Sequence, residues 1–385
     1  MKRIQSIDFV RGLVMIIMAL DHVRDLIHVP SLTQSPTNLA TTSPALFFTR
    51  WITYLCAPTF VFLAGTSVYL SMKNKEISKT KSFLLKRGLW LIVLEFVVVN
   101  FALYFDIGYH NLIFEVIATI GFGFIILSLL LKTSWKLIAA LGLLIIFLHN
   151  LSPFLPLGDS PVLKQVIMAF FGPAGFPIGN RVFVVAYPPI PWLGIMLVGF
   201  AAGKLFERAQ EKRQRLLAII GTFALFLFVI IRYVNVYGDS VPWSYKTSSL
   251  YTFLSFMNVT KYPPSLVFCL VTLGIMFLML AIAERVKGML LQVVSVYGKV
   301  PLFYFLLHFF VIHIIMIVIM VFQGFTWEQM DFTSGNFGRP KGLPSGLPLT
   351  QIYFLWIAIV ALLYFPCKWY GTYKAKHKNW WLKYI

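Results

Sequence analysis

The sequence predicts an all-α, polytopic integral membrane protein, a bundle of about ten transmembrane helices with both termini in the cytoplasm. Hydrophobic residues make up 59% of its 385 residues and charged residues only 12%, whereas a soluble globular chain is about one-quarter charged. Apolar runs of about 20 residues recur along the chain, and each is long enough to cross a bilayer. No fixed repeat divides the sequence, so we expect residues 1–385 to form a single transmembrane domain.

The apolar runs place the spans near residues 9–28, 46–72, 88–105, 113–131, 137–155, 186–205, 216–234, 265–283, 300–322 and 351–370. Two spans carry stretches of small residues, at 64–67 and at Gly199 and Gly203, and these predict close helix packing. Between the fifth and sixth spans lies a long segment rich in Gly and Pro. Within it we expect a short interfacial helix over residues 162–171.

Basic residues set the expected orientation. The net charge is +19, and the Lys and Arg residues cluster between alternate spans, at 2–3, 73–87, 132–136, 204–215, 285–299 and 368–383. This is the positive-inside bias, and we expect an integral protein of a plasma membrane with its basic segments in the cytoplasm. The charge therefore predicts contact with membrane lipids and not with nucleic acid. Three Cys residues in apolar segments, without metal-type spacing, predict no disulfide framework and no metal site.

The first span is unusual because it carries many ionisable residues. In hydrocarbon each of these must find a partner or a water-filled site. Arg11 and His22 are eleven residues apart, about three helical turns, so they share one face roughly 16 Å apart along the axis. Asp8 lies one turn before Arg11, and Asp25 one turn after His22. One polar stripe should therefore connect the two membrane surfaces.

His22 is the candidate general base, because an unperturbed imidazole titrates near neutral pH. Asp25, or Asp21 beside it, could orient the ring and stabilise its cation. A histidine at a helix end in the membrane interface is the alternative reading. Arg11 and Asp8 also have two readings. They form an ion pair that allows insertion, or Arg11 binds the phosphates of coenzyme A near the cytoplasmic side.

Other polar residues are expected near the outer side and could line a substrate site with His22: Arg50, His110, His149, Asn150, Lys261, Tyr262 and His308. Each has a simpler alternative. Arg50 could snorkel to the interface, and His149 and Asn150 could cap a helix end. His308, inside the ninth span, could make only a structural hydrogen bond.

Several segments in order carry a family resemblance: SIDFVRG, DHVRD, APTFVFLAGTS, YPPIPWLG, KYPPSLVF and GKVPLFYFLLH. Together they resemble a bacterial family related to the catalytic domain of heparan-alpha-glucosaminide N-acetyltransferase, within a wider group of transmembrane acyltransferases. That group includes O-acyltransferases of surface polysaccharides with an Arg and a His eleven residues apart on the first helix, which Arg11 and His22 match. The lysosomal enzyme has Asn where this chain has His22. Its proposed active-site His has no counterpart near residues 42–44, so heparan-type N-acetylation is not implied.

The resemblance implies an enzyme that moves an acyl group, acetyl in the first instance, from cytoplasmic acyl-CoA to an outer acceptor such as a cell-envelope sugar or glycolipid. No Walker loop or nucleophile elbow is present in the sequence. A transporter or export protein for a small or lipid-linked substrate remains the alternative, because buried charges also serve proton relays.

Overall fold

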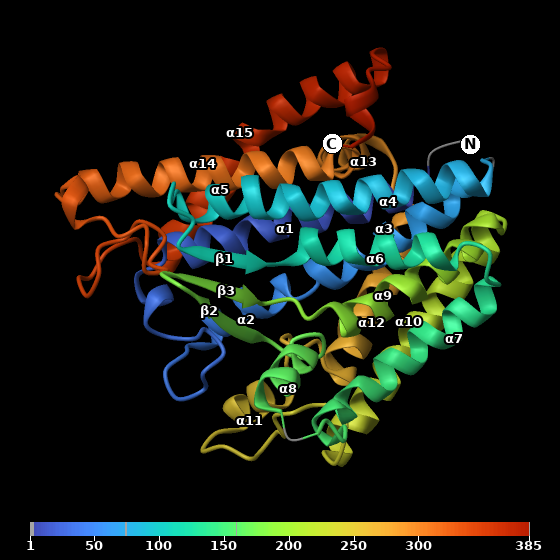
Figure 1. The fold of residues 1–385 in the computed structure, drawn as a ribbon, viewed down its shortest axis with the longest axis horizontal. Coiled ribbons are helices and arrows are strands. Elements are labelled where there is room, and N and C mark those ends of the chain that lie inside the picture. The colour runs from blue at the N-terminus through green and yellow to red at the C-terminus, as the bar shows by residue number, and fades with distance from the viewer. Residues whose placement is uncertain (1–3, 74, 159, 385) are drawn as a thin grey trace.

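The computed structural model describes residues 4–73, 75–158 and 160–384, which form a helical bundle (Figure 1). Within these residues, seven helices are long and apolar enough to cross a membrane: Pro44–Met72, Trp135–Phe154, Pro189–Glu207, Gln210–Val234, Leu266–Ala283, Pro301–Phe322 and Leu349–Lys376. The predicted fold class, a helical membrane bundle, is confirmed. The first basic pair, Lys2 and Arg3, lies outside the described residues.

The predicted spans correspond in order to single helices or to helices with a bend. The first five spans map to α1 (Gln5–Ile27), α2 with α3 (Pro44–Thr53, Cys56–Met72), α4 with α5 (Ile77–Leu94, Asn100–Tyr104), α6 (Val116–Leu130) and α7 (Trp135–Leu148). The other five map to α9 (Pro189–Ala202), α10 (Gln210–Val234), α12 (Leu266–Ala283), α14 (Pro301–Phe322) and α15 (Leu349–Lys376). Short helices α8 (Pro161–Met168), α11 (Ser249–Met257) and α13 (Gly288–Lys299) lie between them. The expected interfacial helix is α8.

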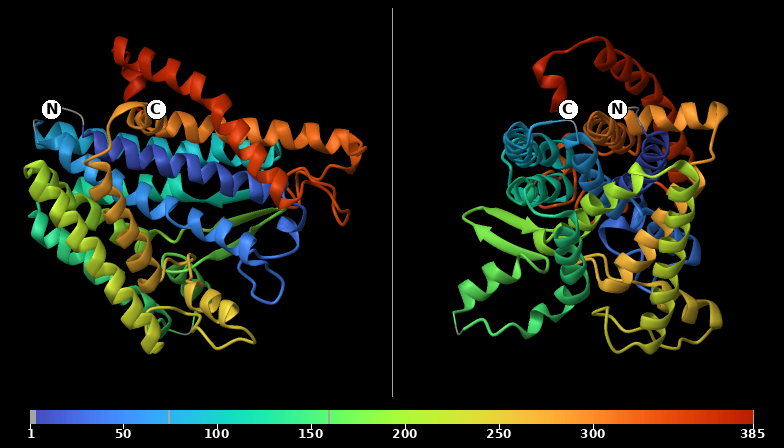
Figure 2. Two further views of the ribbon diagram at one scale, coloured as in Figure 1. Left: turned by 180° about the vertical axis from the view of Figure 1, so that it is seen from behind. Right: turned by 90° about the vertical axis from the view of Figure 1, so that its right-hand side faces the viewer.

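The bundle is organised around α1. Its buried residues run from Ser6 to Ile27 on all sides of the helix, and it contacts α2, α3, α12, α13, α14 and α15. Both described ends of the chain lie on the same side as α13 and the start of α4 (Figure 2). That side carries the basic segments, so the positive-inside rule predicts that it faces the cytoplasm. Because α1 is surrounded by other helices, most of its ionisable residues lie inside the protein.

Glycines let the central helices touch at their backbones. A Cβ on Gly298 of α13 would lie 1.9 Å from the carbonyl oxygen of Asp8 in α1. The predicted small-residue surfaces behave in the same way where α3 crosses α9, because a Cβ on Gly199 would lie 2.1 Å from the carbonyl oxygen of Phe62. Such contacts leave no room for a methyl group, and they fix the positions of the helices that carry the site.

The second span is divided into two helices, where the sequence predicted one. The break at Tyr54 and Leu55 comes just before Pro58, which has no N–H to bond the carbonyl of Tyr54 four residues earlier. The chain therefore bends at membrane depth. This bend turns Arg50 of α2 and Cys56 of α3 toward one outer cavity.

A small sheet is the one departure from the all-α prediction. Strand β1 (Asn111–Phe114) pairs in parallel with β3 (Arg181–Val185), which pairs antiparallel with β2 (Ala174–Ile178). The β2–β3 hairpin turns at Gly179, where φ is +60°, a conformation that favours glycine. Because β1 replaces the start of the predicted fourth span, Glu115 follows a strand at its junction with α6. This junction faces α1.

The last outer loop is tied to the outer end of α1 by a buried arginine. Arg339 donates to the carbonyl oxygen of His28 at 2.8 Å, to that of Val29 at 3.1 Å and to the hydroxyl of Ser31 at 2.8 Å. Burial, followed by the guanidinium groups of Arg24 and Arg339, lowers the pKa of His28 to about 4. The His28 side chain is therefore neutral at pH 7, and it adds no further cation to this end of α1.

Candidate functional site

Two cavities lie along α1, one in each half of the bundle. The outer pocket has a volume of about 280 Å³, and α1 contributes Asp21, His22 and Asp25 to its lining. The inner pocket has a volume of about 430 Å³, and α1 contributes Arg11. The ionisable residues of α1 are thus divided between the two halves, with Arg11 in one pocket and Asp21, His22 and Asp25 in the other. Three side chains line both pockets and form the wall between them: Phe60, Val116 and Phe305.

His22 is bonded to a second histidine. Its Nδ1 lies 2.6 Å from Nε2 of His308 in α14, and His308 is fully buried. His308 Nδ1 in turn contacts the carbonyl oxygens of Tyr304, at 3.2 Å, and Phe305. A carbonyl oxygen only accepts, so the proton of a neutral His308 is on Nδ1, and its Nε2 accepts. The proton shared by the two rings is therefore on His22 Nδ1.

This chain of bonds assigns the tautomer of His22. With Nδ1 as the donor, Nε2 of His22 carries the unshared electron pair. Among the described residues Nε2 has no hydrogen-bond partner, and the ring lines the outer pocket. Phe309 stacks on the ring, with centroids 4.4 Å apart, and limits its rotation. A base nitrogen is thus held in a fixed orientation at the cavity.

The carboxylates next to His22 are bonded to arginines. Arg24 contacts Asp21 at 2.7 Å and Asp25 at 2.6 Å. Arg50 of α2 also contacts Asp21, and it lies 3.8 Å from Asp25. Two cations and two anions form a closed group, which we call the charge quartet. Within the described residues neither carboxylate bonds the His22 ring, so the orienting contact expected from Asp25 or Asp21 is made by His308.

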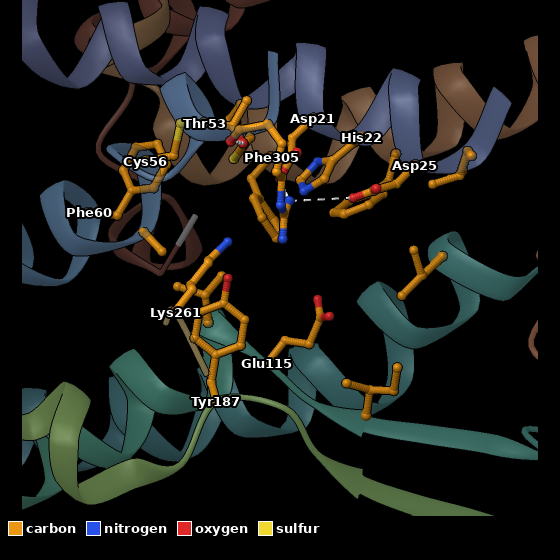
Figure 3. Close-up of a pocket in the computed structure, with 18 of the residues that line it drawn as sticks. Asp21, His22, Asp25, Thr53, Cys56, Phe60, Glu115, Tyr187, Lys261 and Phe305 are labelled. Carbon is orange, nitrogen blue, oxygen red and sulfur yellow. Dashed lines mark hydrogen bonds and ion pairs between the residues drawn. The ribbon is translucent and has the colours of Figure 1, made fainter. Parts of the chain in front are cut away.

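Two further charged side chains face the outer pocket without an ion pair in the described structure (Figure 3). Lys261 comes from the outer loop before α12, and its Nζ lies 4.9 Å from the ring centre of Tyr262 and 5.7 Å from that of Tyr187. Glu115 points into the same space from the junction of β1 and α6. The pocket therefore presents a base, an ammonium group and a carboxyl group to whatever enters it.

The inner pocket has a different character. Five cations line it: Arg11, Lys75, Arg87, Lys299 and Lys374. Its described lining contains no carboxylate, and the remainder is apolar apart from Ser67 and Ser71. Arg11 donates to Ser67 at 2.9 Å and also lies 3.5 Å from Asp8. Both readings of Arg11 are thus compatible with its position, because it pairs with Asp8 and still lines the cavity. Asp8 itself does not line the pocket.

The structure brings some of the predicted lining residues together and not others. Arg50, Lys261 and Tyr262 line the outer pocket with His22, and His308 supports His22 from behind. His110 does not line it, because its Nδ1 bonds Asp106 at 2.9 Å in the loop before β1.

The predicted pair at the end of α7 is also placed elsewhere. His149 Nδ1 bonds the carbonyl oxygen of Ile145 at 3.0 Å, one turn earlier on its own helix. Asn150 accepts from the backbone N–H of Leu266 at 3.1 Å and so joins α7 to α12. Both side chains terminate and pack a helix, as their simpler alternative stated, and neither lines the outer pocket.

Sequence reasoning missed Glu115 and Tyr187. Glu115 is the only acid in the stretch from Asn111 to Leu131, and a single carboxylate at the start of an apolar run is a signal for a functional site. Tyr187 gave no such signal, because it enters the pocket only through the pairing of β3 with β1. Phe60 and Phe305, which form part of the wall between the two pockets, also could not be distinguished from the many other apolar residues of the sequence.

A comparison with known proteins identifies the family of the chain. A family model described as "Heparan-alpha-glucosaminide N-acetyltransferase, catalytic" matches residues 3–233. That range holds α1 with Arg11 and His22, and also Arg50, Glu115 and Tyr187. No curated protein matches the chain. Since the matched range covers more than half of the sequence, the chain belongs to the family of membrane proteins related to the heparan-alpha-glucosaminide N-acetyltransferase catalytic domain.

Proposed function

We propose that the protein is a membrane acyltransferase that moves an acyl group, acetyl in the first instance, from cytoplasmic acyl-CoA to an acceptor on the outer side of the bacterial plasma membrane. A cell-envelope sugar or glycolipid is the expected acceptor. One observation carries the proposal. A cation-lined inner pocket and an outer pocket with an unbonded histidine nitrogen share a wall formed by Phe60, Val116 and Phe305.

The inner pocket suits the donor. Coenzyme A combines phosphates with a long, weakly polar arm that ends in the thioester. Lys and Arg at the mouth would bind the phosphates, as Arg11 suits phosphate oxygens by its planar guanidinium. The apolar depth of the pocket would take the arm. Its end would then meet Phe305 at the wall, and a side-chain movement of Phe305 or Phe60 would admit the acyl group to the outer pocket.

The reaction at the outer pocket then needs one base. His22 Nε2 takes the proton from an acceptor hydroxyl or amine, and the acceptor atom attacks the thioester carbonyl. The new C–O or C–N bond forms, the C–S bond breaks, and the proton passes from His22 to the departing thiolate. His22 is neutral again when free coenzyme A leaves. His308 holds the tautomer that can start this cycle, and the charge quartet keeps the outer end of α1 in place.

A transporter is the second candidate, because two cavities separated by a thin wall would also suit alternating access. The two functions differ in what the inner pocket binds. A transporter would carry the same substrate in both pockets, whereas these pockets differ in charge. The inner one has five cations and no carboxylate in its described lining, and the outer one combines Arg50 and Lys261 with Asp21, Asp25 and Glu115.

Acetyl-CoA should stabilise the detergent-purified protein against heat. A ligand that binds only the folded state adds about 2.7 kcal/mol at one hundred times its dissociation constant. Acetyl-pantetheine lacks the nucleotide phosphates and should stabilise far less at equal concentration. Replacing Lys299 by glutamine should reduce the effect of acetyl-CoA and leave that of acetyl-pantetheine unchanged. If no acyl-CoA of any chain length shifts the melting temperature, the acyltransferase proposal is wrong and the transporter is favoured.

A further inference from the structure

We propose that Lys261 binds an anionic group, a carboxylate or a phosphate, on a sugar-like acceptor in the outer pocket. This inference rests on the proposed function, which makes the outer pocket the acceptor site. It adds the chemical class of the acceptor, namely a polar ring that carries a negative charge next to the hydroxyl or amine that receives the acyl group.

The first argument is the state of the Lys261 side chain. The residue is only 6% exposed, and in the described structure no carboxylate lies within 4 Å of its Nζ and no acceptor bonds it. Its contacts are the rings of Tyr54, Tyr187 and Tyr262, with Nζ 6.0, 5.7 and 4.9 Å from their centres. Ring faces attract a cation but do not accept its three N–H groups as a carboxylate would. The stem of Lys261 is thus buried while its ammonium group faces the pocket, where an anionic ligand can supply the acceptor that the rings do not.

The second argument is the charge balance of the pocket. Arg24 and Arg50 are already neutralised by Asp21 and Asp25 in the charge quartet. The quartet thus leaves no carboxylate for Lys261 and no arginine for an incoming anion. Glu115 points into the same cavity, and no ion pair joins it to Lys261 in the described residues (Figure 3). A ligand between them would place its anion at Lys261 and a hydroxyl or amine at Glu115.

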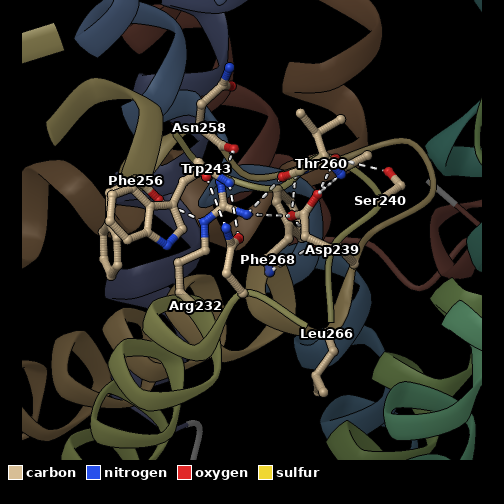
Figure 4. Close-up of polar contacts among 12 residues, drawn as sticks. Arg232, Asp239, Ser240, Trp243, Phe256, Asn258, Thr260, Leu266 and Phe268 are labelled. Carbon is tan, nitrogen blue, oxygen red and sulfur yellow. Dashed lines mark hydrogen bonds and ion pairs between the residues drawn. The ribbon is translucent and has the colours of Figure 1, made fainter. Parts of the chain in front are cut away.

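The third argument is that Lys261 is held in position before any ligand arrives. Asp239 accepts from the backbone N–H of Thr260 at 3.0 Å and from the hydroxyl of Ser265 at 2.8 Å, on both sides of Lys261 (Figure 4). Arg232 lies 3.9 Å from Asp239. Its guanidinium donates to the carbonyl oxygens of Val241, Phe256, Ser255 and Asn258. The whole outer loop is therefore fixed around the lysine, as a binding site requires.

The shape of the pocket restricts the ligand. A volume of about 280 Å³ is at the small end of ligand pockets, so it suits one ring at a time. Tyr187, Tyr262 and Phe337 give it aromatic walls, and the hydroxyls of Tyr262 and Tyr187 lie 3.4 Å apart. Aromatic walls with a few polar groups fit a sugar ring. The acceptor we infer is therefore a sugar acid or a sugar phosphate.

The test measures thermal stabilisation of the full-length protein by three soluble probes: glucuronate, glucose 1-phosphate and glucose. The wild-type protein should respond to at least one anionic probe at concentrations where glucose has no effect. The two anionic probes separate a carboxylate from a phosphate. Lys261→Met should weaken the apparent affinity about tenfold or more, the loss expected for one charge-assisted hydrogen bond. Glu115→Gln should not weaken the affinity, because glutamine keeps the shape of the side chain and removes a carboxyl group that can only repel an anion in the same cavity.

The donor pocket could also bind phosphate, so each probe is measured with and without saturating coenzyme A. An effect that vanishes with coenzyme A but survives in Lys261→Met belongs to the inner pocket and overturns the inference. Equal stabilisation by glucose and both anions overturns it as well. If the Lys261→Met protein keeps its anion affinity but loses turnover, Lys261 stabilises charge during the reaction and does not bind the acceptor. That result would also overturn the inference. If the donor proposal fails, coenzyme A gives no shift while the glucuronate or glucose 1-phosphate shift remains.

Discussion

His22→Ala should lower acyl transfer by about 10² to 10⁴-fold, the usual contribution of a general base. The imidazole contributes a single unbonded nitrogen to the outer pocket, and alanine removes that nitrogen from the position where the proposed reaction needs it. The binding of acyl-CoA should be nearly unchanged, because His22 does not line the inner pocket. The measurement is turnover of labelled acetyl-CoA, with donor affinity from the melting shift and monodispersity checked first.

His110→Ala provides the matched control for this variant. His110 is also a histidine of the outer half, but it bonds Asp106 in the loop before β1 and does not line the outer pocket. Its replacement should leave turnover within about twofold of wild type, since the proposed chemistry does not use it. Wild-type turnover by His22→Ala would end the assignment of His22 as the base.

His308→Leu should also reduce turnover strongly, although His308 does not line either pocket. Without Nε2 as an acceptor, His22 Nδ1–H loses its partner 2.6 Å away, and the ring is free to adopt the other tautomer. The expected loss lies between about tenfold, for one hydrogen bond, and about 10⁴-fold, the cost of a wrong tautomer in a catalytic triad. The loss should appear in kcat, with KM for acyl-CoA nearly unchanged.

The conservative variant separates positioning from packing. In His308→Gln the side-chain amide oxygen can accept from His22 Nδ1–H, while the amide NH₂ can donate to the carbonyl oxygen of Tyr304. We therefore expect His308→Gln to recover much of the turnover that His308→Leu loses, even though both remove the ring. Equal turnover in the two variants would mean that His308 serves only to fill the core.

The local part of the site could be predicted from the sequence. Helical periodicity places Arg11 and His22 on one face of α1, and the structure puts each into its own pocket on that face. Small residues at 64–67 and at Gly199 likewise predicted close packing on two spans, and in the structure these two surfaces meet where α3 crosses α9. Each pattern can be recognised within a single helix, without knowing where the neighbouring helices lie.

The tertiary part of the site could not be predicted in this way. The partner of His22 was expected one turn away, at Asp25, yet the bond is to His308, 286 residues further along the chain. Asp21, the other expected partner, forms an ion pair with Arg50 of α2 and does not bond His22 in the described structure. Nothing in the local sequence ranks one buried partner above another. Only the arrangement of α2 and α14 around α1 decides which polar groups meet.

Irregular backbone explains the other differences. Residues 111–115 were expected at the start of the fourth span or just before it, but β1 pairs with β3 there, and Glu115 at the end of the strand points into the outer pocket. His149 was expected in the cavity, but at the end of α7 it bonds the carbonyl oxygens of its own last turn. Strand pairing and helix ends depend on partners and on unpaired carbonyls, which periodicity does not describe.

The central claim is that an acyl group crosses the membrane between the two pockets, and sealed proteoliposomes test it most directly. Labelled acetyl-CoA is supplied only on the side of the basic segments. A membrane-impermeant panel of sugar acids, sugar phosphates and amino sugars is supplied only on the other side. The account predicts label on an acceptor in the outer compartment, free coenzyme A on the donor side, and neither with His22→Ala protein. Transfer that occurs only when donor and acceptor share one compartment would contradict it.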